Sequence, residues 1–126
     1  MHSTSTDHRF NRVVNYGLRD LILKVAIEET CSKRQVHVDN VEGVEELLVL
    51  LRVKKPLEKV IVLCDLIGTE NDLQKLTNLK DGFNLRLLGF YPHVNRAIKE
   101  KAQKAGIDYI IPRSGLIPKL RELIGQ

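Results

Sequence analysis

Residues 59–65 read Lys-Val-Ile-Val-Leu-Cys-Asp, a continuous apolar run with a charged residue at each end. A run of this kind, without polar alternation, is typical of a strand that helices cover on both faces of a parallel sheet. It predicts a buried central strand that ends at Asp65, with Cys64 as a small core residue.

Strands and helices are expected to alternate on both sides of this central strand. β-Prone stretches bounded by turn residues predict four more strands, at residues 10–16, 35–38, 85–90 and 108–112. Helical spacing of apolar residues predicts a helix after each strand, at residues 18–31, 44–53, 72–79, 94–105 and 116–124. Asp39-Asn40 is expected to form a turn, and Lys54-Lys55-Pro56 to end the second helix.

The first of these helices has a predicted apolar face and a predicted polar face. The apolar residues, which are expected to pack on the sheet, are Leu18, Leu21, Ile22, Val25 and Ala26. The polar residues, which are expected to face solvent, are Arg19, Lys24, Glu28 and Glu29.

The third helix has a candidate start signal. Thr69 is followed three residues later by Asp72, a spacing that resembles a capping box, although the usual residue at that position of the motif is glutamate or glutamine. The motif predicts a helix from Asp72 to Leu79, which Asp81-Gly82 closes.

Five successive strand-then-helix units occupy most of the 126 residues. This order predicts an α/β fold, in which right-handed crossovers place helices on both faces of a parallel sheet. Residues 10–126 are expected to form a single domain, and residues 1–9 a polar N-terminal tail.

The composition excludes several classes of protein. Hydrophobic residues make up 43% of the chain and charged residues 29%, a balance that argues against a disordered chain. The longest apolar stretches, at 47–51 and 60–64, are far shorter than the roughly 20 residues that span a bilayer. Met1 to Phe10 lacks the apolar segment of a secretory signal, so a cytoplasmic protein is expected.

The chain has two cysteines, Cys31 and Cys64. They are too few and too far apart for a disulfide framework or a zinc site. Both are therefore expected to be reduced.

Three stretches carry a resemblance to a known family: 60–66 (Val-Ile-Val-Leu-Cys-Asp-Leu), 87–94 (Leu-Leu-Gly-Phe-Tyr-Pro-His-Val) and 105–114 (Ala-Gly-Ile-Asp-Tyr-Ile-Ile-Pro-Arg-Ser). With the order of elements, they resemble the CheY-like receiver domains of response regulators, especially the degenerate stand-alone or pseudo-receiver members. The resemblance implies a flavodoxin-like three-layer sandwich with strand order 2-1-3-4-5. Its functional crevice would lie at the carboxyl ends of the strands.

The resemblance also implies a degenerate phosphoacceptor site. Asp65 stands where active receivers carry the phosphorylated aspartate. Gly89 stands in place of the hydroxyl residue of the fourth strand, and Arg113 and Ser114 in place of the lysine and proline after the fifth. The aromatic switch position matches either Tyr109 or Ile110.

The acidic pair that binds Mg²⁺ in active receivers has no match within residues 12–18. Asp7 and Asp20 lie too far from that position in the sequence to be expected to take the role of the acidic pair. No metal site and no cofactor are therefore expected.

Two further features of the crevice are expected from where these residues fall at the ends of the fourth and fifth strands. His93 and Tyr91 would form a polar rim near Asp65. Arg113 could bind an anion together with Ser114, but an ion pair with Asp65 is the favoured reading.

Positive charge is concentrated in the last third of the chain. The formal net charge is +4, yet residues 86–126 hold eight basic and three acidic residues. The candidate interaction face comprises Arg96, Lys99, Lys104, Lys119 and Arg121. It could meet a protein partner, a second copy through the fourth helix, fifth strand and fifth helix, or, with less support, a nucleic acid.

No catalytic set is visible, because the chain lacks a glycine-rich phosphate loop, a serine nucleophile elbow and paired histidines at metal-binding spacing. The leading hypothesis is a small, non-catalytic regulatory or scaffolding protein that acts through protein–protein interaction. One alternative is an atypical response regulator phosphorylated on Asp65. The other is a nucleic-acid accessory protein that uses the basic last third.

Overall fold

A parallel sheet of five strands forms the centre of the molecule. The structure is a computed structural model that describes residues 9–53, 58–92 and 95–125. The strands are β1 (Arg12–Tyr16), β2 (His37–Val41), β3 (Val60–Asp65), β4 (Leu85–Tyr91) and β5 (Tyr109–Pro112). Their order across the sheet is β2-β1-β3-β4-β5, which confirms the predicted topology.

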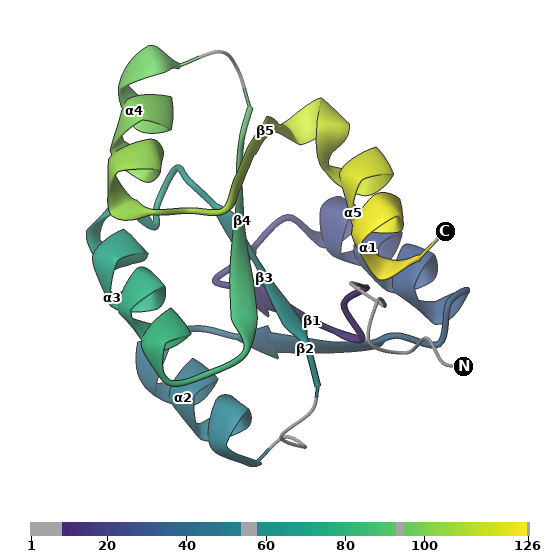
Figure 1. The fold of residues 1–126 in the computed structure, drawn as a ribbon. Coiled ribbons are helices and arrows are strands. Elements are labelled where there is room, and N and C mark those ends of the chain that lie inside the picture. Colours follow the sequence, from purple (N-terminus) through teal and green to yellow (C-terminus); the bar gives the residue numbers. More distant parts are fainter. Residues whose placement is uncertain (1–8, 54–57, 93–94, 126) are drawn as a thin grey trace, which may run out of the picture.

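Helices cover both faces of the sheet, as Figure 1 shows. One face carries α1 (Leu21–Ser32) and α5 (Leu116–Ile124). The other face carries α2 (Val44–Val53), α3 (Leu73–Asn78) and α4 (Arg96–Ala105). Short 3₁₀ turns lie on either side of α3, at Glu70–Asp72 and Leu79–Asp81, and another precedes α5, at Arg113–Gly115.

The central strand β3 is buried on both faces, as its apolar run predicts. Val60, Val62 and Cys64 join the core cluster under α2, α3 and α4, while Ile61 and Leu63 join the cluster under α1 and α5. Removing each large aliphatic side chain from water contributes about 1.5–3 kcal/mol to folding. The prediction that Cys64 is a core residue is confirmed, because none of its surface is exposed.

The second strand lies later in the chain than the sequence predicts. It spans His37–Val41, so Asp39 and Asn40 are strand residues rather than a turn. Polar partners on β1 hold them there: Arg12 Nη1 lies 2.5 Å from Asp39 Oδ2, and Asn15 Nδ2 donates to Asn40 Oδ1 at 3.0 Å. Cross-strand polar contacts have overridden the local turn preference of these two residues.

The predicted apolar face of the first helix is wrong at three of its five residues, although Leu18, which precedes the helix, is buried as predicted. The side chains of α1 that are buried are Leu23, Ile27, Thr30 and Cys31. Leu21, Ile22 and Val25, which were expected to pack on the sheet, are 72%, 84% and 54% exposed. Asp20 caps the helix, which begins at Leu21, and the side that packs on the sheet is the one opposite Leu21, Ile22 and Val25.

The capping box at Thr69 is also wrong. The Thr69 hydroxyl donates to the Asp65 carbonyl at 2.6 Å, and the Asp72 carboxylate accepts from the Tyr16 hydroxyl at 2.7 Å. Both side chains are thereby used by the loops at the carboxyl edge of the sheet, and α3 begins one residue later, at Leu73.

The C-terminal elements lie close to their predicted positions. Helix α5 spans the predicted residues, and α4 ends at Gly106, whose φ of 92° is the left-handed conformation that glycine adopts readily. The predicted stop at Lys54-Lys55-Pro56 and the predicted helix start at Val94 lie outside the described residues. Within the described residues, no helix is long and apolar enough to cross a membrane.

Candidate functional site

A hollow of about 280 Å³ lies at the carboxyl ends of β1 and β3. In a sheet of this order, the chain adds β2 on one side of β1 and then crosses back to add β3 on the other side. Ligand sites of open α/β folds form between the two strands at which the strand order reverses, here β1 and β3. The hollow is lined by Tyr16, Gly17, Arg19, Asp20, Glu42, Asp65, Ile67, Gly68, Thr69 and Asp72. Asp65 is therefore in the predicted crevice, and Asp20, which sequence separation argued against, is there as well.

Asp65 is a partly buried carboxylate at the end of β3. Its Oδ1 accepts a hydrogen bond from the Ile67 backbone N–H at 3.0 Å. Burial raises the pKa of Asp65 above its ordinary value, and the nearby carboxylates of Glu70 and Asp20 act in the same direction. The Ile67 N–H and the charge of Arg113 offset only part of this effect.

Arg113 pairs with Asp20, so the predicted ion pair between Arg113 and Asp65 is wrong. Arg113 leaves β5 in the 3₁₀ turn and donates from Nη2 to Asp20 Oδ2. The other oxygen of Asp20 accepts from the Leu23 N–H at 3.0 Å and caps α1. The Leu23 N–H and Arg113 together lower the pKa of Asp20.

Tyr16 is a residue of the hollow that the sequence did not single out. It ends β1, is almost fully buried, and donates its hydroxyl hydrogen bond to Asp72 at the start of α3. Burial and the Asp72 carboxylate both raise the pKa of Tyr16. The hydrogen bond joins the end of β1 to the 3₁₀ turn before α3, in the region where the resemblance placed the acidic pair of active receivers.

Gly89 has a packing role and does not line the hollow. It lies within β4, opposite Cys64 of β3, and β4 continues to Tyr91. A Cβ atom on Gly89 would lie 2.5 Å from Leu66 Cδ2 and 2.8 Å from Leu66 Cγ. The buried Leu66 side chain fills the space that a larger residue would need.

The predicted polar rim is not formed by Tyr91. This residue is only 5% exposed and belongs to the core cluster under α2, α3 and α4. His93 lies outside the described residues. Ser114 is exposed in the turn before α5, and neither it nor Arg113 lines the hollow.

The two candidates for the aromatic switch position are both partly buried in β5. Ile110 packs against the core cluster under α2, α3 and α4. Tyr109 packs against the opposite cluster, with the Lys119 Nζ atom 5.0 Å from the centre of its ring. The structure therefore shows alternate residues of this edge strand facing opposite layers.

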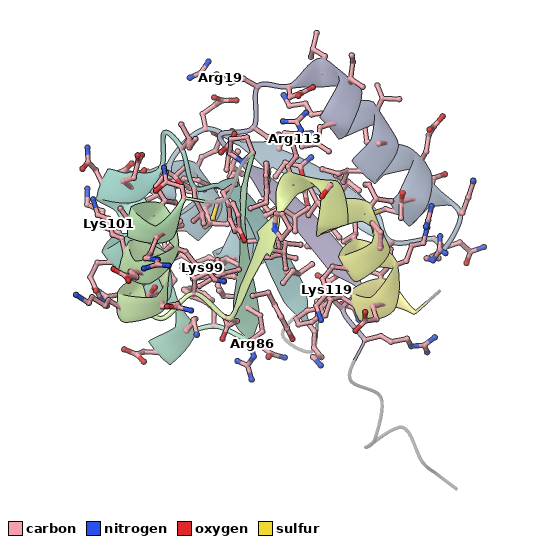
Figure 2. The ribbon with its side chains drawn as sticks, turned by 90° about the horizontal axis from the view of Figure 1, so that it is seen from above. Arg19, Arg86, Lys99, Lys101, Arg113 and Lys119 are labelled. Carbon is pink, nitrogen blue, oxygen red and sulfur yellow. The ribbon has the colours of Figure 1, made fainter. Side chains whose placement is uncertain are left out.

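The predicted interaction face is exposed at most of its positions. Arg96, Lys99 and Lys104 are exposed on α4, and Arg121 is exposed on α5. Lys119 is partly buried and lies 3.3 Å from Glu122. Figure 2 shows Lys99 on α4 and Lys119 on α5, on the two sides of β5.

In the parts of the chain that the structure describes, no group of three or more histidine, cysteine, aspartate or glutamate side chains is placed to hold a metal ion. Two of the four carboxylates that line the hollow have other partners. Asp20 is bound to Arg113, and Asp72 to Tyr16.

Substituting Asp65 with asparagine should stabilise the protein at neutral pH. Because the folded state raises the pKa of Asp65, the ionised carboxylate destabilises the fold above that pKa. Asparagine removes the charge and still accepts from the Ile67 N–H. We expect the melting temperature at pH 7 to rise by roughly 1–3 °C.

The gain from Asp65→Asn should shrink as the pH falls and vanish below the unfolded-state pKa, near 3.8. Melting curves of wild type and variant across this range measure it. Asp81→Asn, at an exposed aspartate outside the hollow, is the matched control and should leave the melting temperature unchanged. The prediction is wrong if the difference in melting temperature between Asp65→Asn and wild type is no larger at pH 7 than at pH 3.5.

Comparison with known proteins gives a structural relative. The sequence matches no protein-family model and no curated protein sequence. The structure is similar to the crystal structure of a response regulator from Thermotoga maritima, with a TM-score of 0.70 and 17% sequence identity. The similarity covers 93% of this chain and 100% of that one. The chain therefore has the flavodoxin-like fold of a CheY-like response-regulator receiver domain.

Proposed function

We propose that this chain is a small, non-catalytic signalling protein that works by contact with a protein partner and is not switched by ordinary Mg²⁺-dependent phosphorylation. The receiver fold that it shares with a response regulator supports a signalling role. The observation that carries the rest of the proposal is the ion pair between Asp20 and Arg113 beside Asp65.

Phosphoryl transfer to an aspartate needs cations and fixed donors aimed at the transferring oxygens. Arg113 is the basic residue that follows β5, and its guanidinium donates to Asp20. Asp20 is the acid of the loop after β1, and both of its oxygens have partners, Leu23 N–H and Arg113. These two charged groups, both of which act on the pKa of Asp65, thus neutralise each other.

The basic surface of α4 is the favoured contact surface. Arg96, Lys99, Lys101 and Lys104 are exposed on this helix, against a single acid, Glu100. A two-fold contact through this surface would place like charges opposite each other, whereas an acidic protein surface would be complementary. Among the described residues, the exposed large apolar side chains all lie on other elements, at Leu21, Ile22, Val25, Val49, Val53 and Ile67.

A nucleic acid would meet the same positive charge. Base stacking on single strands requires accessible aromatic rings. In the basic last third, Phe90 and Tyr91 are buried, and Tyr109 is partly buried and lies under Lys119. The surface therefore favours an acidic protein.

Incubation with Mg²⁺ and a small-molecule phosphodonor, followed by intact-mass measurement, tests the proposal. We expect no phosphate-sized gain in mass, because the donors that phosphoryl transfer needs are engaged elsewhere. A known active receiver domain, treated in parallel, shows that the donor is competent.

A mass gain in wild type that is lost in Asp65→Asn but kept in Asp72→Asn would overturn the proposal in favour of an Asp65-phosphorylated regulator. Asp72 is the suitable control because it lines the same hollow and bonds to Tyr16 rather than to the Asp20–Arg113 pair.

A further inference from the structure

A groove of about 240 Å³ lies between α3 and α4, which pack side by side on one face of the sheet (Figure 1). Its lining residues are Glu70, Leu73 and Gln74 on the α3 side and Lys101, Lys104 and Ala105 on α4. Leu73 is only 3% exposed and Ala105 is partly buried, whereas Lys101 and Lys104 are exposed. The groove therefore combines an apolar inner wall with two positive charges at its rim.

The two lysines of this groove have no acidic partner within the described part of the chain. Neither Lys101 nor Lys104 forms an ion pair with another described residue. Residues three apart on a helix are neighbours, so the two like charges repel each other. The acid across the groove, Glu70, accepts a hydrogen bond from the Gly68 N–H at 2.7 Å instead. Two adjacent positive charges are thus left for a partner to neutralise.

We propose that this α3–α4 groove, defined by its six lining residues, receives an acidic segment of a partner protein. One aliphatic side chain of the segment enters the groove and covers Leu73 and Ala105. Carboxylates beside that side chain pair with Lys101 and Lys104. The inference rests on the proposed contact between α4 and an acidic protein, and adds to it the place and the chemistry of that contact.

The size and the lining of the groove favour such a segment. Pockets for small molecules enclose about 300–1,000 Å³, so a groove of about 240 Å³ suits a single side chain. A nucleic acid could offer phosphates to the lysines, but no aromatic ring lines the groove for a base to stack on. Carboxylates around one aliphatic side chain are complementary to both the charge and the apolar wall.

The opposite side of α4 offers a matched comparison. Lys99 and Lys101 are about 200° apart around the helix axis, and Figure 2 shows Lys99 on the side toward β5. Arg96 is three residues before Lys99 and is therefore its neighbour on the helix surface. The homodimer expected from the sequence, through the fourth helix, fifth strand and fifth helix, would use this side. Charge reversals on the two sides of one helix therefore distinguish the two contacts.

An NMR titration of isotope-labelled protein with a synthetic peptide tests the proposal. The probe is a capped peptide of one leucine flanked by glutamates, added at physiological salt. Backbone amide shifts should change most at the residues that line the α3–α4 groove. Lys101→Glu/Lys104→Glu should raise the dissociation constant at least about tenfold. The matched control Arg96→Glu/Lys99→Glu should raise it less than about threefold, because salt screens exposed charges on the far side of the helix.

A second peptide, with serine in place of leucine, tests the apolar wall. It carries the same charge but buries no aliphatic side chain, so it should bind about tenfold more weakly. Melting curves establish that both double variants are folded. Equal affinity for the two peptides, or equal losses in the two double variants, overturns the groove but leaves an acidic contact on α4 standing. A titration in which no resonance of α4 shifts overturns both this inference and the proposed contact.

Discussion

Gly89→Thr should lower the free energy of unfolding by about 3 kcal/mol, even though it introduces the type of hydroxyl residue that active receiver domains carry in their fourth strand. A Cβ atom at this position would lie 2.5 Å from Leu66 Cδ2 and 2.8 Å from Cγ, closer than packed carbon atoms can approach. Leu66 has no exposed surface into which it could move. Overpacking of a core costs about 1–3 kcal/mol, and a β-branched side chain belongs at the upper end of that range.

Urea unfolding of four variants measures this effect and assigns its cause. Gly82→Ala is the matched control, because no atom lies within 4 Å of the added Cβ and φ is −114°. It should change stability by less than about 0.5 kcal/mol. Leu66→Ala alone should cost about 2–5 kcal/mol through the cavity it leaves.

The double variant Gly89→Thr/Leu66→Ala should lose less stability than the sum of the single losses, because the threonine occupies space that Leu66 vacates. Additive losses would mean that Leu66 is not what excludes a side chain at position 89. A Gly89→Thr protein as stable as wild type would contradict the packing argument altogether.

Gly89 also shows the limit of sequence alignment at this site. The sequence shows that position 89 is glycine and not a hydroxyl residue, but it does not show that Leu66 fills the space that a side chain at this position would need. Leu66 follows Asp65 directly in the chain, and the contact with Gly89 depends on the register between β3 and β4, in which Cys64 pairs with Gly89. Register is a tertiary property that the local sequence does not specify.

The fold itself could be predicted because its signals are local. The apolar run of β3 and the alternation of strands with helices predicted a parallel sheet covered by helices on both faces. The resemblance to receiver domains implied the order β2-β1-β3-β4-β5, and the structure confirms both. The face of α1 could not be predicted in the same way, because apolar residues lie on both sides of that helix. Which of the two sides is buried depends on packing against the sheet, which the spacing of apolar residues along a single helix does not specify.

Only part of the candidate site could be predicted, because some of its residues have a local signal in the sequence and others meet only in the folded protein. Asp65 could be placed, since the end of a strand is visible in the sequence. The partner of Arg113 could not, because Asp20 is 93 residues away in the chain and meets Arg113 only across the carboxyl edge of the sheet. Tyr16 was missed because a strand-ending tyrosine is an ordinary core residue until Asp72 is brought opposite its hydroxyl.

Asp20→Ala should lower the melting temperature by roughly 3–8 °C, the other large effect that we expect. The substitution removes two interactions at once: the acceptor for the Leu23 N–H in the first turn of α1, and the ion pair with Arg113. Asp20→Asn keeps an oxygen for the helix cap but loses the charge. It should therefore cost less than Asp20→Ala, and the difference between the two measures the cap.

The pH dependence of these melting curves separates the charge from the cap. The folded state lowers the pKa of Asp20, so its ionised form stabilises the protein at neutral pH and that contribution is lost as the pH falls through the lowered pKa. The deficit of Asp20→Asn should accordingly be largest at neutral pH and should decrease on acidification.

Arg113→Gln supplies the reciprocal variant. If Asp20 and Arg113 act as a pair, the double variant Asp20→Asn/Arg113→Gln should be more stable than the two single losses predict. Releasing Arg113 by Asp20→Asn should also lower the pKa of Asp65, because a carboxylate that raises this pKa is removed while the positive charge stays nearby. A carboxylate titration by NMR in which the Asp65 pKa does not fall would show that the pair has no influence on the candidate phosphoacceptor, and would remove the main support for a site inactivated by this ion pair.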